Sequence, residues 1–160
     1  MKKNHLPRSV ALLVTTLLLA GPSFADGTYK SHASLKSDFQ TMDWNGGKVT
    51  VGSLKGVMKV YGSNTAKMPN GDKIQNCLMR VVRMSGGTDI ITNCGVTDKD
   101  GDTLYSISER KQGDINTGGK GKTTFIGGTG KYAGASGSCE YGASYLPDNW
   151  LSVDSDCTVK

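Results

Sequence analysis

Short runs of alternating apolar and polar residues, each ended by a turn signal, constrain the fold of this chain more than any other feature. In residues 28–39, the apolar side chains Tyr29, Leu35 and Phe39 fall on one side of an extended chain and charged side chains on the other. Similar runs recur roughly every 10 to 15 residues, and no long apolar helical stripe interrupts them. About eight strands result, with breaks expected at Gly52 and Gly56. The pattern predicts an all-β sandwich or barrel.

The four cysteines lie symmetrically about two of the predicted turns. The midpoints of the two pairs fall in the turns at residues 85–87 and 147–149. Facing residues of an antiparallel hairpin have Cβ atoms about 4.5–5.5 Å apart, close to what a disulfide needs. Four cysteines allow three pairings, and the absence of a CxxC motif disfavours a metal site. We predict two hairpin disulfides on or near the apolar face, Cys77–Cys94 and Cys139–Cys157.

The first 25 residues have the pattern of a secretory signal peptide. Three basic residues precede an apolar run over residues 10–20, and Ser23-Phe24-Ala25 ends the segment with a small-x-small pattern. The apolar run is shorter than the roughly 20 residues that span a bilayer. We therefore expect cleavage before Asp26 and an exported, periplasmic or extracellular protein without a membrane span. An uncleaved anchor is the alternative.

The remaining residues, 26–160, are predicted to form a single domain. No linker rich in proline or serine divides them, and about 135 residues suit one hydrophobic core. Removing the three basic residues of the leader, Lys2, Lys3 and Arg8, lowers the formal net charge from +5 to +2. So small a charge on an exported protein argues against nucleic acid as a partner.

A glycine-rich stretch, GGTGKYAGASG at residues 127–137, suggests a phosphate-binding loop and fails each test for one. Gly130-Lys131 is followed by Tyr132 where a Walker motif needs serine or threonine, and Phe125 stands where its first glycine belongs. The spacing also misses the dinucleotide fingerprint by one residue. No helix is expected after the stretch to supply the backbone amides that hold phosphate. We expect no nucleotide and no other cofactor.

An acidic turn at residues 98–109 resembles a calcium loop in part. Asp98, Asp100 and Asp102 occupy positions 1, 3 and 5, and Glu109 falls at position 12. Position 6, which requires glycine, is Thr103, and the flanking segments are predicted strands rather than helices. An exposed Asp-Gly hairpin turn is the interpretation we favour over a calcium site.

Few residues are candidates for catalysis. His32 is the only histidine after the leader, and its strand pattern places it on the polar face. Glu109 shares a side with Tyr105, so it is either a rim residue or an interior carboxylate that acts as an acid or base. Arg80 shares the side of several apolar residues, which makes it a second candidate for the interior. Tyr141 and Tyr145 either pack in the core or line a cavity.

The segment TTFIGGTGKYAGASGSCEY resembles a pattern of the allene oxide cyclase-like and dirigent-like β-barrels. CGVTDKDGDTLY, upstream, resembles a turn of small secreted bacterial proteins with this barrel, and the two signatures together cover residues 94–141. The resemblance implies an eight-stranded antiparallel barrel. Its motif supplies no acid, base or ligand, so no catalytic or metal residue is carried over. The residues that match the glycine pattern are Gly127, Gly128, Thr129, Gly130, Tyr132, Gly134 and Gly137.

Within this resemblance, the glycine stretch has a structural interpretation. Gly127 and Gly128 end a strand at a barrel corner, where positive φ or a bulge is needed. Tyr132 folds back to plug one end of the barrel. Gly134 and Gly137 let the chain pass close to that ring and re-enter the sheet.

Three functions follow from the sequence. The first is a non-enzymatic exported barrel that binds a small apolar ligand. The second is a cyclase or isomerase that uses an interior carboxylate such as Glu109 on a lipid-like substrate. The third is a module that binds another protein through exposed loops, as an inhibitor or host-interaction factor does. Fold resemblance by itself selects none of them.

Overall fold

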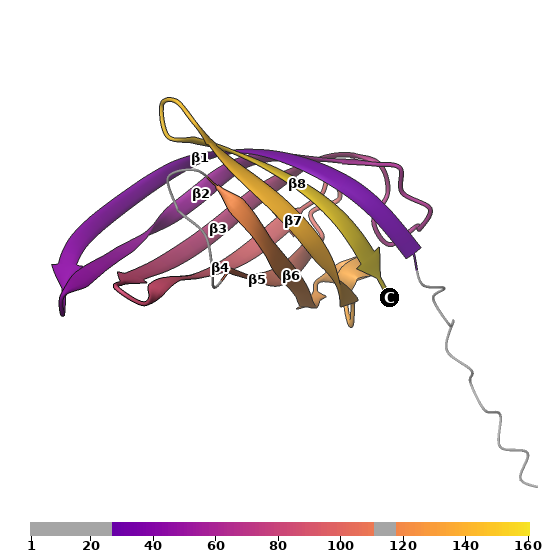
Figure 1. Cartoon of the computed structure of the whole chain (residues 1–160). Helices are drawn as coiled ribbons and strands as arrows, with labels where there is room; N and C mark the ends of the chain where they lie inside the picture. Colours follow the sequence, from indigo (N-terminus) through magenta and orange to yellow (C-terminus); the bar gives the residue numbers. More distant parts are fainter. Residues whose placement is uncertain (1–26, 111–117) are drawn as a thin grey trace, which may run out of the picture.

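The strands predicted from the alternating pattern close into one barrel (Figure 1). The computed structural model describes residues 27–110 and 118–160, so the predicted leader lies outside the described residues. Each strand pairs antiparallel with the next, and the last pairs with the first. The predicted eight-stranded antiparallel barrel is confirmed. The elements are β1 (Gly27–Trp44), β2 (Gly47–Tyr61), β3 (Gly71–Met84), β4 (Gly87–Thr97), β5 (Thr103–Arg110), β6 (Gly119–Gly128), the 3-10 turn η1 (Gly130–Tyr132), β7 (Ser136–Leu146) and β8 (Trp150–Val159).

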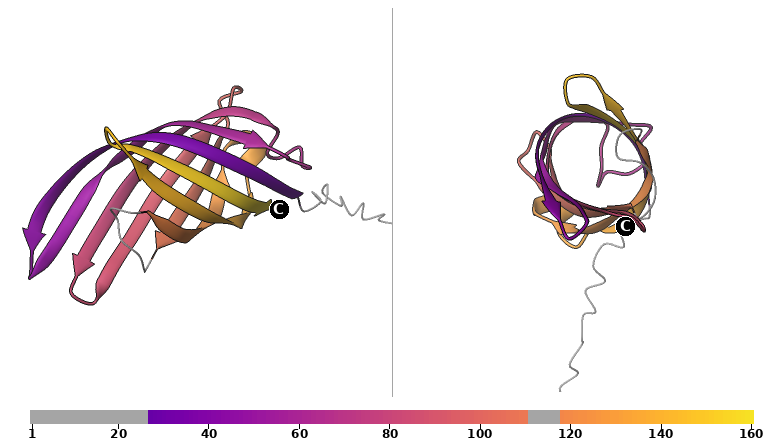
Figure 2. Two further views of the ribbon diagram at one scale, coloured as in Figure 1. Left: turned by 45° about the horizontal axis from the view of Figure 1, so that its top comes forward. Right: turned by 60° about the vertical axis from the view of Figure 1, so that its left-hand side comes forward.

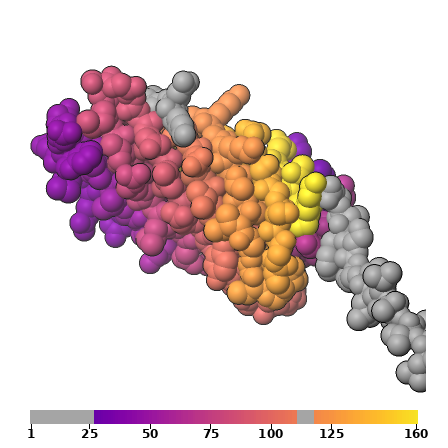
Figure 3. All heavy atoms as spheres, turned by 90° about the horizontal axis from the view of Figure 1, so that it is seen from below, coloured from indigo at the N-terminus to yellow at the C-terminus, as the bar shows by residue number. Residues whose placement is uncertain are grey.

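The right-hand view of Figure 2 looks close to along the barrel axis, and the strands there form a ring. In the space-filling view, the colours of the wall pass steadily from pink through orange to yellow (Figure 3), as simple next-neighbour pairing requires. The hairpin of β1 and β2 is the longest, with 18 and 15 residues, and it extends beyond the other strands at the left of Figure 1.

Strand β2 is continuous, and the expected breaks at Gly52 and Gly56 do not occur. Both glycines instead allow β1 to approach β2 closely. A Cβ atom at Gly52 would overlap the carbonyl oxygen of Asp38, and one at Gly56 would overlap that of Ser34. The absence of a side chain here serves backbone contact between two coiled strands rather than strand termination.

Every second residue of each strand points into the barrel, and the core lies there. In β1 the predicted apolar side is the inner one: Tyr29 and Leu35 are buried, and Phe39 is half-buried against them. Ser31 lies between them on the same side and is equally buried. The interior therefore holds small polar side chains as well as large apolar ones.

The two predicted disulfides are confirmed, and both lie inside the barrel. Cys77 and Cys94 are register partners of β3 and β4, and Cys139 and Cys157 are partners of β7 and β8. All four cysteines are buried. Disulfides of this kind form and persist in oxidising compartments, which agrees with export of the chain.

Removing one disulfide will destabilise the barrel without opening it. We expect the double substitution Cys139→Ala and Cys157→Ala to lower the free energy of unfolding by about 3 kcal/mol, because the bond closes a loop of 18 residues in the unfolded chain. Urea denaturation followed by circular dichroism measures the change. A variant as stable as the parent would contradict the entropic argument, and an unchanged far-ultraviolet spectrum is the control for retained fold.

Candidate functional site

The barrel interior contains a cavity of about 100 Å³. Its walls are mainly apolar, and both disulfides contribute to them. Side chains from all eight strands reach it, so no single loop forms the site. Among the apolar residues that line it are Leu35, Leu54, Met58, Met79, Ile90, Leu104 and Phe125.

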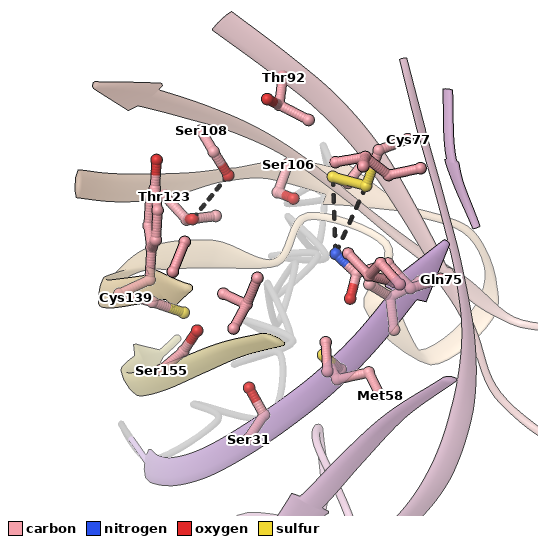
Figure 4. A pocket seen from close by; sticks show the side chains of 18 of the residues that line it. Ser31, Met58, Gln75, Cys77, Thr92, Ser106, Ser108, Thr123, Cys139 and Ser155 are labelled. Carbon is pink, nitrogen blue, oxygen red and sulfur yellow. Dashed lines mark hydrogen bonds between the residues drawn. A yellow bond between two sulfur atoms is a disulfide. The ribbon is translucent and has the colours of Figure 1, made fainter. Parts of the chain in front are cut away.

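Small polar side chains interrupt the apolar lining (Figure 4). The Oγ atom of Ser108 and the Oγ1 atom of Thr123 lie 2.7 Å apart and hydrogen-bond to each other. Gln75 directs Nε2 at the sulfurs of the Cys77–Cys94 disulfide, 3.5 and 3.6 Å away, and its Oε1 has no partner. The other serines and threonines of the wall are Ser31, Thr92, Ser106 and Ser155.

Arg110 lies at one end of the cavity, and two glycines make room there. It is the last residue of β5 and is only 4% exposed. A Cβ atom at Gly119 would lie 2.9 Å from Nη1 of Arg110, and one at Gly121 would overlap the Tyr141 hydroxyl. The glycine-rich start of β6 therefore allows an arginine and a tyrosine to occupy the lumen where side chains of β6 would otherwise stand.

Two tyrosines accompany Arg110 on the inner face of β7. Burial raises the pKa of both the Tyr141 and the Tyr145 hydroxyl, against the opposing effect of the Arg110 charge. Arg110 donates a hydrogen bond to Tyr145, and the charge of Arg83 also acts on that hydroxyl. Both phenols thus stay neutral near pH 7 and keep an O–H group to donate. Tyr145 and Arg83 also line a neighbouring hollow at this end of the barrel.

Of the two alternatives for Glu109, the interior one does not hold, and the candidate interior position of Arg80 does not hold either. Both are exposed on the outer face, because Arg110 and Met79, their neighbours in sequence, point inward. The apolar residues that share their side are outward too, and Leu78 is 69% exposed. Apolar character marks the inner face poorly here, since much of a folded protein's surface is apolar.

His32 lies on the outer face, as its position in the alternation indicates. Its Nδ1 atom is 2.8 Å from Oδ1 of Asp154, and its Nε2 atom is 3.4 Å from Oγ of Ser34. The imidazole is 44% exposed. It does not reach the cavity, so it belongs to a surface pair rather than to the interior.

Tyr132 and Met68 pack in the core near the opposite end of the barrel, where β5 begins. Both are fully buried, and the Tyr132 hydroxyl lies 3.9 Å from the Met68 sulfur. Gly127 (φ +103°), Gly130 (φ +51°) and Gly134 (φ +70°) turn the chain around the ring with left-handed backbone that favours glycine. This is where the matched glycine pattern lies, and it forms a corner of the barrel.

The acidic turn packs directly against this corner through Asp98. Its Oδ2 atom accepts hydrogen bonds from the Tyr132 hydroxyl at 3.1 Å and from Lys131 Nζ at 2.6 Å. Its Oδ1 atom accepts from the backbone N–H groups of Asp100 and Asp102 at 2.9 and 3.2 Å. The two sequence signatures, 34 residues apart at Asp98 and Tyr132, are therefore one physical unit.

A lysine ammonium takes the place that the calcium interpretation gives to a metal ion. Lys131 Nζ bridges Asp98 and Asp100 at 2.6 and 2.9 Å. Glu109, at the far end of β5 and on its outer face, does not join them. Among the described residues, no group of three or more histidine, cysteine or carboxylate side chains is arranged to hold a metal ion.

Comparison of the chain with models of protein families, with characterised proteins and with solved structures gives no match. No helix in residues 27–110 and 118–160 is long and apolar enough to cross a membrane.

Proposed function

We propose that this protein is an exported, non-enzymatic barrel that binds a small, mainly apolar ligand in its interior. The observation that carries the proposal is the cavity of about 100 Å³ inside the barrel, with predominantly apolar walls. An apolar cavity of about 150 Å³ accommodates benzene, so the space here suits one small ring or a short chain. Small closed barrels either fill with side chains or hold one such ligand.

The lining favours binding over catalysis. In the part of the chain that the structure describes, no aspartate, glutamate or histidine lines the cavity. A cyclase or isomerase needs a positioned acid or base beside the substrate, and the carboxylate expected to act as one, Glu109, is on the outer face. The unpartnered Oε1 of Gln75 offers a hydrogen-bond acceptor rather than a proton-transfer group at neutral pH.

Location and family belong to the same proposal. The predicted leader and the two disulfides support delivery to the periplasm or the extracellular space. Membership of the allene oxide cyclase-like and dirigent-like barrels is supported by the eight-stranded closure and by the glycine corner around Tyr132. No activity of that family is carried over with the fold.

An exposed apolar patch on the outer wall supports protein binding as a second candidate function. Val57 and Ile74 are register partners on β2 and β3, and Leu78 lies four residues along the same face. The Tyr105 ring leans over Gly95 toward β3 and extends the patch. Exposed apolar clusters of this kind mark interaction surfaces.

Binding of a neutral apolar probe tests the proposed function. Native mass spectrometry of the purified protein, compared with denatured protein, reveals a bound ligand or a second protein copy. For protein free of ligand, we expect 1-hexanol to give saturable shifts of the backbone amides of cavity-lining residues in a nuclear magnetic resonance titration. Filling the cavity with Ala143→Leu is expected to weaken this binding by about 10-fold or more, because the ligand and the added side chain compete for one space.

The matched control is Ser144→Leu, which adds a similar side chain to the outer face of the same strand. It is expected to bind 1-hexanol as the parent does. A protein that carries no ligand and shows no saturable shifts would contradict the proposal. An oligomer in the native spectrum, lost on Leu78→Asp, would favour the second candidate.

A further inference from the structure

Arg110 is a buried cation whose charge is not matched by any carboxylate in the described part of the chain. The residue is 4% exposed, and two of its nitrogens, Nε and Nη2, are buried without a hydrogen-bond partner. Buried charges in proteins are normally paired or coordinated, because taking an ion out of water without compensation is costly. An arginine held in this state points to a partner that comes from outside the chain.

A second positive charge lies near Arg110 at this end of the lumen. Arg83 of β3 acts on the same tyrosine, Tyr145. Among the described residues, none that lines the cavity carries a carboxylate. Asp89 precedes Ile90, the register partner of Arg110 on β4, but its side chain lies on the opposite face of that strand, and its buried Oδ1 atom has no hydrogen-bond partner. This end of the lumen is therefore electropositive and attracts an anion.

The hydrogen-bonding groups at this end are donors. Nε and Nη2 of Arg110 form one edge of the planar guanidinium, which matches the two oxygens of a carboxylate. The neutral hydroxyls of Tyr141 and Tyr145 lie beside it and donate in addition. Beyond them, toward Tyr132, the wall becomes apolar and includes Leu104 and Phe125.

We infer that Arg110, assisted by Tyr141 and Tyr145, binds the carboxylate of a small carboxylic acid whose apolar tail extends into the cavity toward Tyr132. The inference rests on the proposed function, since it names the chemical class of the ligand held in the same cavity. A single guanidinium suits a singly charged group, and a volume of about 100 Å³ suits a tail of a few carbons.

A pair of probes that differ only in the head group tests this inference. Hexanoate and 1-hexanol share the same tail, and their dissociation constants are measured by the same titration at pH 7. We expect hexanoate to bind about 10- to 100-fold more tightly than 1-hexanol, as charge-assisted hydrogen bonds to a buried arginine imply. Arg110→Met is expected to abolish this preference, so that the two probes bind this variant with dissociation constants within about 3-fold of each other.

Two control variants keep the result specific to this side chain. Arg80→Met removes an exposed arginine from the outer face and is expected to leave both affinities unchanged. Asp114→Asn removes the carboxylate of residues 111–117, which lie outside the described residues, and is expected to change hexanoate binding by less than about 2-fold. Tighter binding by this variant would identify Asp114 as a competing partner of Arg110 and overturn the inference.

Stability without ligand gives a second, independent measurement. Arg110→Met is expected to raise the urea midpoint of the empty protein, because it removes a buried charge that lacks a partner. Arg110→Lys keeps the charge but not the planar edge, so it is expected to retain only part of the hexanoate preference. A lower midpoint in Arg110→Met would mean that the chain itself satisfies Arg110.

The failures of the two proposals are distinguishable. If neither probe binds, the interior is not a ligand site and both proposals fall. If 1-hexanol and hexanoate bind equally well to the parent and to Arg110→Met, the cavity binds apolar ligands and only the carboxylate subsite is overturned.

Discussion

Replacing Tyr132 by alanine is expected to lower the free energy of unfolding by about 3–5 kcal/mol, among the largest effects of any single substitution in this barrel. The ring is fully buried in the core, as is Met68, whose sulfur lies 3.9 Å from the Tyr132 hydroxyl. Its removal leaves a cavity that the glycine corner cannot fill and deletes the hydrogen bond to Asp98. Urea denaturation of the two proteins, followed by tryptophan fluorescence, measures the loss.

Two further variants show which part of the effect belongs to the buried ring. One removes only the Tyr132 hydroxyl, and the other removes a tyrosine from the surface. Tyr132→Phe keeps the ring and loses only the hydrogen bond to Asp98, so we expect it to lower the free energy of unfolding by about 1–2 kcal/mol. Tyr105→Ala removes a tyrosine from the outer face, where it is 43% exposed, and should cost less than about 1 kcal/mol. A loss below about 1 kcal/mol for Tyr132→Ala would show that this ring does not close the barrel end.

The fold could be predicted because its determinants are local. Alternation of side chains and turn residues define the strands one at a time, and the four cysteines fix the register of two hairpins. Cys77 and Cys94 are facing partners, as symmetry about their turn requires. Each of these signals spans fewer than about 20 residues, so each can be recognised without knowing the rest of the structure.

The inner face of β3 and β5 could also have been predicted, from the disulfides rather than from apolarity. A buried Cys77 places Met79 inside and Arg80 outside, because side chains alternate along a strand. Ser106 is the register partner of Cys94, so the same reasoning turns Arg110 inward and Glu109 outward. Apolar residues were the poorer guide, since Leu78 is exposed whereas Ser106 is buried.

The contents of the cavity could not be predicted, because they depend on contacts between distant strands. Nothing in the sequence distinguishes Gly119 and Gly121 from other glycines. The structure shows that Arg110 and Tyr141 occupy the space that side chains at these positions would fill. In the same way, nothing local to the acidic turn indicates that Asp98 meets Tyr132. A register shift between β5 and β6, at Leu104 and Ser106, helps to bring the two segments together.

Asp98→Ala is expected to lower the free energy of unfolding by about 3–5 kcal/mol, as for a buried ion pair that loses one partner. The side chain of Asp98 is 3% exposed, and that of Lys131 is 28% exposed. The substitution leaves Lys131 with only Asp100, and it removes the acceptor from the Tyr132 hydroxyl and from the backbone N–H groups of Asp100 and Asp102. Urea denaturation at pH 7 measures the change.

The exposed pair of Asp156 and Lys30 provides the control. Their atoms lie 3.1 Å apart, and the Asp156 side chain is 72% exposed. Asp156→Ala should therefore change stability by less than about 1 kcal/mol. An equal effect of the two substitutions would contradict a special role for Asp98.

The same carboxylate gives the barrel a defined response to acid. Burial by itself would raise the pKa of Asp98, but hydrogen bonds from Lys131, the Asp100 backbone and Tyr132 outweigh it and hold the pKa at about 2, below the ordinary 3.8. Because the folded pKa is the lower one, the stabilisation is fully present above about pH 5 and is lost as the pH falls toward 2. This stabilisation amounts to about 2 kcal/mol.

Urea denaturation at a series of pH values should show this loss of stability in the parent and a smaller loss in Asp98→Asn. Equal dependence of stability on pH in the two proteins would mean that other carboxylates govern acid stability. Since Asp98 joins the acidic turn to the buried Tyr132 ring, we expect acid to loosen this end of the barrel before it affects the disulfide-bonded hairpins.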